Sequence, residues 1–205
     1  MVELSKTLKA LRQNGMEAEY LDTQEALLRR LAELLPPGGT VASGSSETLT
    51  ALGIRQMLHS GEWTYYDAGD AQLSPAGREQ AIRQAWNADV YLTSVASLTQ
   101  TGELLVVDGT GNRVSALAYG PRSVIVIASR SKITPDAEAA MARLRTVAAP
   151  QNALRRGKTA LPCARSGVCM DCKHPLRMCC YFLKIGFSRT PGRIRVLITG
   201  ETVGF

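Results

Sequence analysis

Short apolar segments alternate with helical patterns along most of this chain, and that alternation restricts the fold more than any other feature. Residues 88–97 (ADVYLTSVAS) and 123–129 (SVIVIAS) are rich in apolar and β-branched side chains, which is typical of strands buried on both faces of a sheet. Further strands are expected within residues 17–23, 40–58, 63–68, 102–120 and 193–200. Strands separated by helices favour an α/β fold with a largely parallel sheet flanked by helices.

The helices that separate these strands have recognisable starting points. They are expected at residues 4–13, 23–35, 74–86 and 134–149, with a further helix at the end of 40–58. Thr23, Ser74 and Thr134 are the expected N-capping residues of three of them. A proline directly follows Ser74 and Thr134, at the first helical position, where its missing N–H group does no harm.

Residues 102–120 contain a motif with two interpretations. The favoured interpretation is a hairpin in which Asp108–Asn112 (DGTGN) joins two strands, because glycine and asparagine readily adopt the positive φ of tight turns. In the alternative interpretation, Asn112 and Arg113 present an amide and a guanidinium to a bound carboxylate. Both interpretations stay open at the level of the sequence.

The composition narrows the class of protein. The chain has 205 residues, 45% of them hydrophobic, which is enough for a sizeable core without disulfide bonds. No run of about 18 apolar residues occurs, and the N-terminal segment lacks the apolar block of a signal peptide. We therefore expect no membrane span and a cytoplasmic, reducing location. Clustered cysteines in such a location are more often metal ligands or redox groups than structural bridges.

Basic residues are concentrated toward the C-terminal end. The formal net charge is +6, but residues 143–205 contain 12 basic and 2 acidic residues, a balance of +10. Aromatic side chains are sparse in this segment, which argues against nucleic acid as a partner. The excess charge is expected to face an anionic surface or an anion that the protein itself holds, such as a small anionic metabolite.

All five cysteines lie within residues 162–180 (PCARSGVCMDCKHPLRMCC). A Cys-x2-Cys pair lets two thiolates face one ion, and four cysteines are the number that a structural zinc ion or a cubane iron–sulfur cluster requires. The expected metal ligands are Cys163, Cys169, Cys172 and Cys179. Adjacent cysteines rarely ligate together, so only one of Cys179 and Cys180 is expected to bind the metal; Cys179 is selected here, and Cys180 in its place remains an alternative. The sequence does not decide between an iron–sulfur cluster and zinc, and unliganded thiols or a redox disulfide remain alternatives.

A turn of small residues follows the strand at the start of residues 40–58. Gly44, Ser45 and Ser46 would present N–H groups and hydroxyls at a helix N-terminus beyond the carboxyl end of a strand, where phosphates and carboxylates bind. In the alternative interpretation Ser46 is only an N-cap, and Glu47 in the first helical turn disfavours an anion. The turn is no Walker loop, because the lysine is missing.

Several segments together resemble the LUD-domain family, the lactate-utilisation proteins of bacteria and archaea. They are residues 17–49 (EAEYLDTQEALLRRLAELLPPGGTVASGSSETL), 101–133 (TGELLVVDGTGNRVSALAYGPRSVIVIASRSKI), 145–153 (RTVAAPQNA), 162–172 (PCARSGVCMDC) and 198–205 (ITGETVGF). The resemblance extends over nearly the whole chain and is to the subgroup with a cysteine-bearing C-terminal segment. It implies a single LUD-like α/β domain over residues 1–205, which includes the cysteine-rich segment 162–180.

The resemblance also implies a fold like that of the ribose-phosphate isomerases, glucosamine-phosphate deaminases and CoA transferases. It implies a link to the oxidation of lactate to pyruvate, in which some relatives carry iron–sulfur clusters and belong to multi-protein complexes. Our leading hypothesis is an accessory or electron-transfer protein of organic-acid utilisation. In it the four cysteines hold the metal and the Gly44–Ser46 turn holds a small anion.

Two other classes of function remain alternatives. An enzyme of the isomerase or acyl-transfer type, acting on a small anionic metabolite, would need a carboxylate base or nucleophile, and Glu103 is the candidate. A zinc-stabilised binding or regulatory module would need no redox chemistry. The sequence determines neither the reaction nor the partner proteins within a lactate-oxidising complex, and a homodimer stays open.

Overall fold

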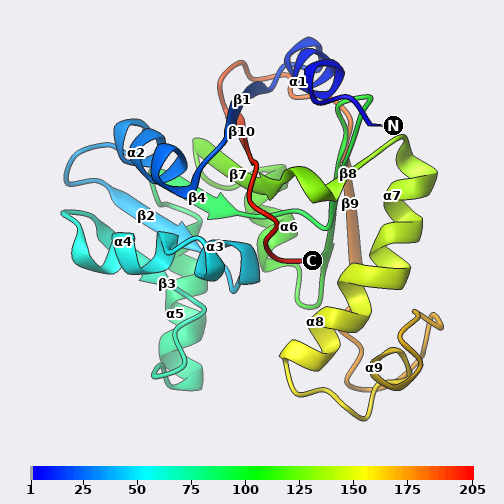
Figure 1. Cartoon of the computed structure of the whole chain (residues 1–205). Coiled ribbons are helices and arrows are strands. Elements are labelled where there is room, and N and C mark those ends of the chain that lie inside the picture. The colour runs from blue at the N-terminus through cyan, green and yellow to red at the C-terminus, as the bar shows by residue number, and fades with distance from the viewer. Residues whose placement is uncertain (1) are drawn as a thin grey trace.

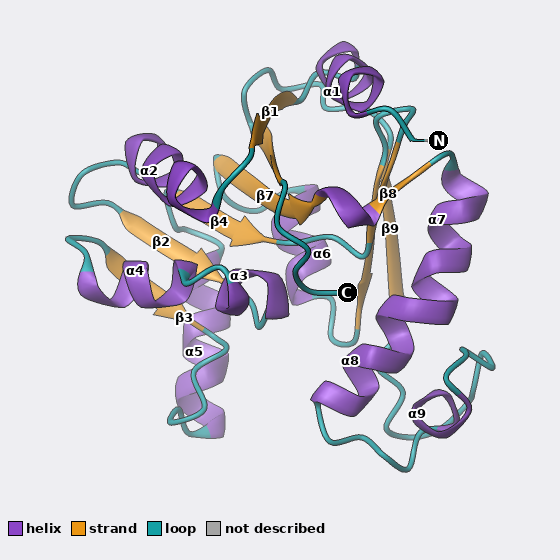
Figure 2. Cartoon of the chain, viewed as in Figure 1, coloured by secondary structure: helices purple, strands orange, loops and turns teal. Residues whose placement is uncertain are grey.

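A six-stranded parallel sheet forms the centre of the fold. The computed structural model describes residues 2–205 (Figure 1 and Figure 2). The strands lie in the order β1 (Glu17–Leu21), β10 (Ile194–Thr199), β7 (Ser123–Ser129), β4 (Val90–Thr93), β2 (Thr40–Ser43) and β3 (Thr64–Asp67), and every neighbouring pair is parallel. Helices flank this sheet, so the α/β class that the alternating pattern predicts is confirmed.

The two faces of the sheet belong to two separate apolar cores. Val126 of β7 lies in one core and its neighbour Ile125 in the other, because successive residues of a strand point to opposite faces. One face is covered by α2 (Gln24–Leu34), α3 (Glu47–Ala51) and α4 (Ile54–Ser60). The other face is covered by α1 (Leu4–Gln13), α5 (Pro75–Ala85), α6 (Asn112–Ala118) and a second sheet. Burial on both sides explains the continuous apolar runs in the sequence.

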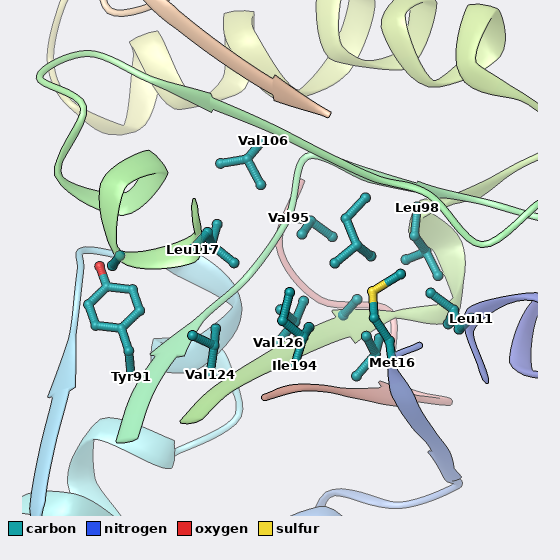
Figure 3. Packing of buried hydrophobic residues seen from close by; sticks show 14 of the residues in the cluster. Leu11, Met16, Tyr91, Val95, Leu98, Val106, Leu117, Val124, Val126 and Ile194 are labelled. Carbon is teal, nitrogen blue, oxygen red and sulfur yellow. The ribbon is translucent and has the colours of Figure 1, made fainter. Parts of the chain in front are cut away.

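The second sheet has four strands and was not predicted from the sequence. Its order is β8 (Ile133–Thr134), β5 (Ser97–Thr99), β6 (Leu104–Asp108) and β9 (Tyr181–Ile185), with β6 antiparallel to both of its neighbours. Figure 3 shows Val106 of this sheet across the shared core from Val124 and Val126 of the larger one. The single strand predicted at residues 88–97 is two strands, β4 and β5, because the chain crosses from one sheet to the other at residues 94–96.

A helical segment runs past the second sheet toward the cysteine-rich segment (Figure 1). It consists of α7 (Ala137–Arg143), a π-helical stretch (Leu144–Ala148) and α8 (Ala149–Arg155), and α9 (Pro162–Ser166) and the 3₁₀ turn Arg130–Lys132 complete the helical elements. Ala140 and Leu144 pack against Leu105 of β6, which fixes this segment to the sheet. None of the helices within residues 2–205 is long and apolar enough to cross a membrane.

The favoured hairpin at residues 102–120 is wrong. Its first half is β6, but the second half is the helix α6, which Gly111 starts with a φ of 86°. The Asp108 carboxylate accepts hydrogen bonds from the backbone N–H groups of Arg113 at 2.7 Å and Val114 at 3.3 Å, and so satisfies donors that a helix start leaves unpaired. Ala116 and Leu117 of this helix are buried in the core that lies between the sheets.

The expected helix caps are confirmed in two of three cases. Thr23 accepts a hydrogen bond from the N–H group of Ala26, and Ser74 accepts one from the N–H group of Gly77. The cap predicted at Thr134 is wrong, because Thr134 pairs within β8 and α7 starts only at residue 137. Asp136 is the actual N-cap, and its carboxylate accepts a hydrogen bond from Ala139 at 2.9 Å.

Candidate functional site

A cavity of about 470 Å³ lies at the carboxyl ends of the parallel strands. Residues that follow four different strands of the larger sheet line it: Ser45 after β2, Ala68 after β3, Ser94 after β4 and Lys132 after β7. Residues of α8, of the β6–α6 connection and of the segment before β9 complete the wall. Ligands of parallel α/β sheets bind at the carboxyl ends of the strands, so this cavity is the candidate functional site.

Two of the three residues of the small-residue turn, Ser45 and Ser46, line this cavity, whereas Gly44 does not. Ser46 lines the cavity and accepts a hydrogen bond from the N–H group of Leu49 at 3.3 Å, so its capping role is present. Ser45 also lines the cavity, and its hydroxyl accepts a hydrogen bond from Arg155 at 3.2 Å. Gly44 is needed for close packing, since an added Cβ would lie 3.0 Å from a tyrosine hydroxyl and 3.1 Å from an arginine side chain. Ligand binding by the turn stays a prediction.

Asn112 and Arg113 line the same cavity, although they are far from the turn in the sequence. The Arg113 guanidinium donates a hydrogen bond to the Val107 carbonyl at 2.5 Å. It takes part in none of the ion pairs formed within residues 2–205. The Arg113 guanidinium therefore has no carboxylate partner in the described chain, which leaves it available to pair with an external anion.

The cavity wall carries more positive than negative charge. Its basic residues are Arg78, Arg113, Lys132, Arg155, Arg156, Lys158 and Arg177, and its acidic residues are Glu47 and Asp108. Glu47 lies 3.9 Å from Arg155, a loose ion pair, whereas both oxygens of Asp108 accept hydrogen bonds from backbone N–H groups. The surplus of cations around one cavity favours an anionic ligand.

Lys132 is a residue of the cavity that the sequence-based candidates did not include. It is only 2% exposed, and its amine donates hydrogen bonds to Thr48 Oγ1 at 2.8 Å, Ser94 Oγ at 3.1 Å and the Val95 carbonyl at 3.2 Å. Burial, and then the charges of two arginines, lower the pKa of Lys132 from 10.5 to about 7. Its position just past the carboxyl end of a buried parallel strand is the sequence signal that could have identified it.

Four of the five cysteines line a second, much smaller cavity of about 20 Å³. They are the four expected metal ligands, Cys163, Cys169, Cys172 and Cys179. Cys180 is exposed and does not line this cavity, and none of the five forms a disulfide. Burial, and then the neighbouring thiols, raise the pKa of Cys179 to about 11. The structure thus brings together the four cysteines that the spacing selects.

These thiols do not converge on a single point. Within residues 2–205, no three His, Cys, Asp or Glu side chains are arranged to hold one metal ion. The metal site therefore stays a prediction, with the four cysteines around one cavity as its structural basis.

The two cavities share part of their walls. Ala149 of α8, together with Arg177, Met178 and Cys179, lines both of them. Arg177 also holds the cysteine-rich segment in place, because its guanidinium donates hydrogen bonds to the carbonyls of Cys179 at 2.8 Å and Cys172 at 2.7 Å. A group bound by the cysteines would consequently be a direct neighbour of a ligand in the large cavity.

Glu103, the candidate for a catalytic carboxylate, does not line the large cavity. It lies just before β6 and forms an ion pair of 2.9 Å with Lys184 of β9. The hydrogen bond from Lys184 lowers the pKa of Glu103. Such an ion pair joins the two neighbouring strands, and no contact of Glu103 relates it to the cavity.

The parallel sheet, its helices and the cavity at the carboxyl ends of the strands define an α/β protein with a candidate ligand site at those strand ends. The family follows from a direct comparison. The family model of the LUD domain matches residues 4–199, and the chain therefore belongs to the LUD-domain family. No curated protein matches its sequence.

Solved structures are similar to the chain at low sequence identity. The crystal structure of a DUF162 family protein from Deinococcus radiodurans superposes with a TM-score of 0.55 and 16% identity, and the match covers 96% of each chain. Ribose 5-phosphate isomerase A from Methanocaldococcus jannaschii matches 54% of this chain and 53% of its own, with 14% identity and a TM-score of 0.36. The Neisseria gonorrhoeae isomerase matches 57% of each chain, with 14% identity and a TM-score of 0.37. The first of these similarities supports the fold alone.

Proposed function

We propose that this LUD-domain protein is an accessory or electron-transfer protein of lactate or other organic-acid utilisation. In this role it binds a small organic anion next to a metal centre held by cysteines. The observation that carries the proposal is the common wall of the two cavities, in which Arg177, Met178 and Cys179 line both. A redox-active group and an organic acid would thereby be neighbours within one chain.

The large cavity supports the anion half of the proposal. Arg113 has no carboxylate partner in the described chain, and Ser45 and Asn112 add neutral polar groups to the same wall. A carboxylate forms its strongest hydrogen bonds with a guanidinium. The cavity volume of about 470 Å³ lies in the range of sites for small molecules.

The small cavity supports the metal half. Its four cysteines are soft ligands, which suit zinc, copper(I) or iron–sulfur clusters. The four ligands of a zinc ion must meet at one point, whereas the cysteines of a cubane cluster bind different iron atoms and stand farther apart. The proposed electron-transfer role needs a redox-active group, which zinc is not, so we propose a cluster rather than zinc for the four cysteines that line the small cavity. When bound, such a cluster supplies one-electron redox chemistry.

The protein would contribute orientation, charge and shielding to this centre. Arg177 donates hydrogen bonds to two carbonyls of the cysteine-rich segment and forms an ion pair of 2.8 Å with Asp171, so its positive charge would offset part of the negative charge of metal-bound thiolates. Ala153, Leu161 and Met178 pack around Cys163 and Cys172 and limit access of water to the thiols. This apolar packing and the guanidinium are the features through which the chain would adjust the reduction potential.

The metal half is tested by the iron and acid-labile sulfide content of protein purified without oxygen, with Cys179→Ser and Cys180→Ser as a matched pair. We expect equal amounts of iron and sulfide in the wild type and in Cys180→Ser, because Cys180 lies outside the small cavity. In Cys179→Ser we expect a loss of most of the iron, since one of four ligands is removed. Zinc without sulfide, or equal iron in the two variants, would refute the proposed centre.

The redox role needs a second measurement. Protein with and without its metal is mixed with a lactate-oxidising partner, and reduction of an electron acceptor is recorded. The proposal predicts transfer only with the metal-loaded protein. Equal rates with both forms would exclude electron transfer and leave only an accessory role.

A further inference from the structure

Lys132 has the surroundings of a reactive amine. It lines the large cavity, yet it is only 2% exposed, so its amine meets the ligand space from a position almost free of bulk water. Its hydrogen-bond partners are two hydroxyls and one carbonyl, all uncharged. A charged ammonium in such a place is costly, and the neutral, nucleophilic amine is correspondingly favoured.

No carboxylate of the described chain offsets the charge of this lysine. Arg113 and Arg143 are its charged neighbours, and both disfavour the ammonium form. The acidic residues of the cavity wall, Glu47 and Asp108, interact with Arg155 and with backbone N–H groups instead. Desolvation beside another cation is a recognised way in which proteins activate a lysine nucleophile.

We propose that Lys132 forms an imine with the carbonyl group of a small 2-oxo acid bound in the large cavity. The proposal rests on the anion site of the proposed function and names the class of ligand for it. A 2-oxo acid combines the two groups that the cavity is equipped to meet: a carboxylate for Arg113 and a carbonyl for the amine. It is also the product class that results when a 2-hydroxy acid such as lactate is oxidised.

The step balances with the groups that the structure provides. The lone pair of the amine attacks the carbonyl carbon, and the electron pair of the C=O bond moves to the oxygen. The nitrogen gives up two protons and the oxygen leaves as water, so that a C=N bond replaces the C=O bond without any oxidant or reductant. The hydroxyl of Thr48, 2.8 Å from the amine and hydrogen-bonded by Ser94 at 3.2 Å, is in place to carry a proton from nitrogen to oxygen.

The experiment traps this imine. The full chain is incubated with pyruvate and sodium cyanoborohydride without oxygen, and the modified peptides are identified by mass spectrometry. We expect a carboxyethyl group on Lys132 and at least tenfold less on every other lysine. Lys132→Met should show no such modification, whereas Lys184→Met, a change at an exposed lysine on β9, should be modified on Lys132 like the wild type.

Controls separate this inference from the proposed function. Lactate, which has the carboxylate but no carbonyl, should slow the trapping without being attached itself. Circular dichroism of Lys132→Met establishes that the variant is folded. Wild-type protein in excess lactate tests the same site without a mutation, because lactate should reduce the amount of adduct on Lys132. If calorimetry detects pyruvate binding but no adduct forms on Lys132, the imine is refuted while the anion site stands. If pyruvate does not bind at all, both are refuted.

Discussion

Replacing Lys132 with methionine should change the pH dependence of folding in a way that its burial determines. Methionine fills a similar volume and carries no charge, so the variant lacks the cost of a buried ammonium. The substitution also removes the lysine donor from Ser94 and the Val95 carbonyl, which costs about 1–3 kcal/mol, whereas Thr48 keeps its hydrogen bond from Ser94. That second cost does not depend on pH, and the two effects can therefore be separated.

The sign and size of the effect follow from the pKa of Lys132. It is about 7 in the folded chain and 10.5, the ordinary value, in the unfolded chain. Between these values the unfolded chain binds more protons, so the wild type gains stability as the pH rises. At about 1.4 kcal/mol per pKa unit, a charged Lys132 destabilises the fold by on the order of 5 kcal/mol below pH 7, and this cost disappears above pH 10.5.

Urea denaturation of the wild type and of Lys132→Met at several pH values measures this cost. The difference in unfolding free energy should shift by about 2–3 kcal/mol between pH 6 and pH 9, in favour of the wild type as the pH rises. Other titrating groups are common to both proteins and cancel. A difference that is the same at every pH would mean that the amine is as well solvated in the folded chain as in the unfolded one.

Two further predictions concern local structure. Asp136→Ala should reduce the unfolding free energy by about 1 kcal/mol, seen as a lower thermal midpoint, because the N-cap of α7 no longer accepts the hydrogen bond from Ala139. An unchanged midpoint would show that another group takes over this hydrogen bond. Gly44→Ala should weaken pyruvate or lactate binding in calorimetry, since the new Cβ would lie 3.0 Å from the Tyr91 hydroxyl and 3.1 Å from the Arg113 side chain, which would have to shift slightly. Unaltered affinity would indicate that Arg113 does not contact the anion.

The sequence determined those features whose causes are local. The Ser74-Pro75 pair starts α5 because the hydroxyl and the proline act on the first turn of the helix itself. The apolar run 123–129 became the buried strand β7, since both of its faces must be covered wherever it lies. The spacing of the cysteines likewise identified the four that surround one cavity, because short loops keep them close together.

The tertiary structure decided what depends on distant segments. Residues 112–118 form a helix rather than a strand because the Asp108 carboxylate pairs with its first N–H groups and the core between the sheets buries its apolar side. Residues that follow four strands line the large cavity. The parallel order of these strands, which no single segment of the sequence reveals, places Lys132 beside Thr48 and Ser94. The sequence reveals that this chain contains a buried strand followed by a lysine. Only the folded sheet removes that lysine from water and thereby lowers the pKa of its amine.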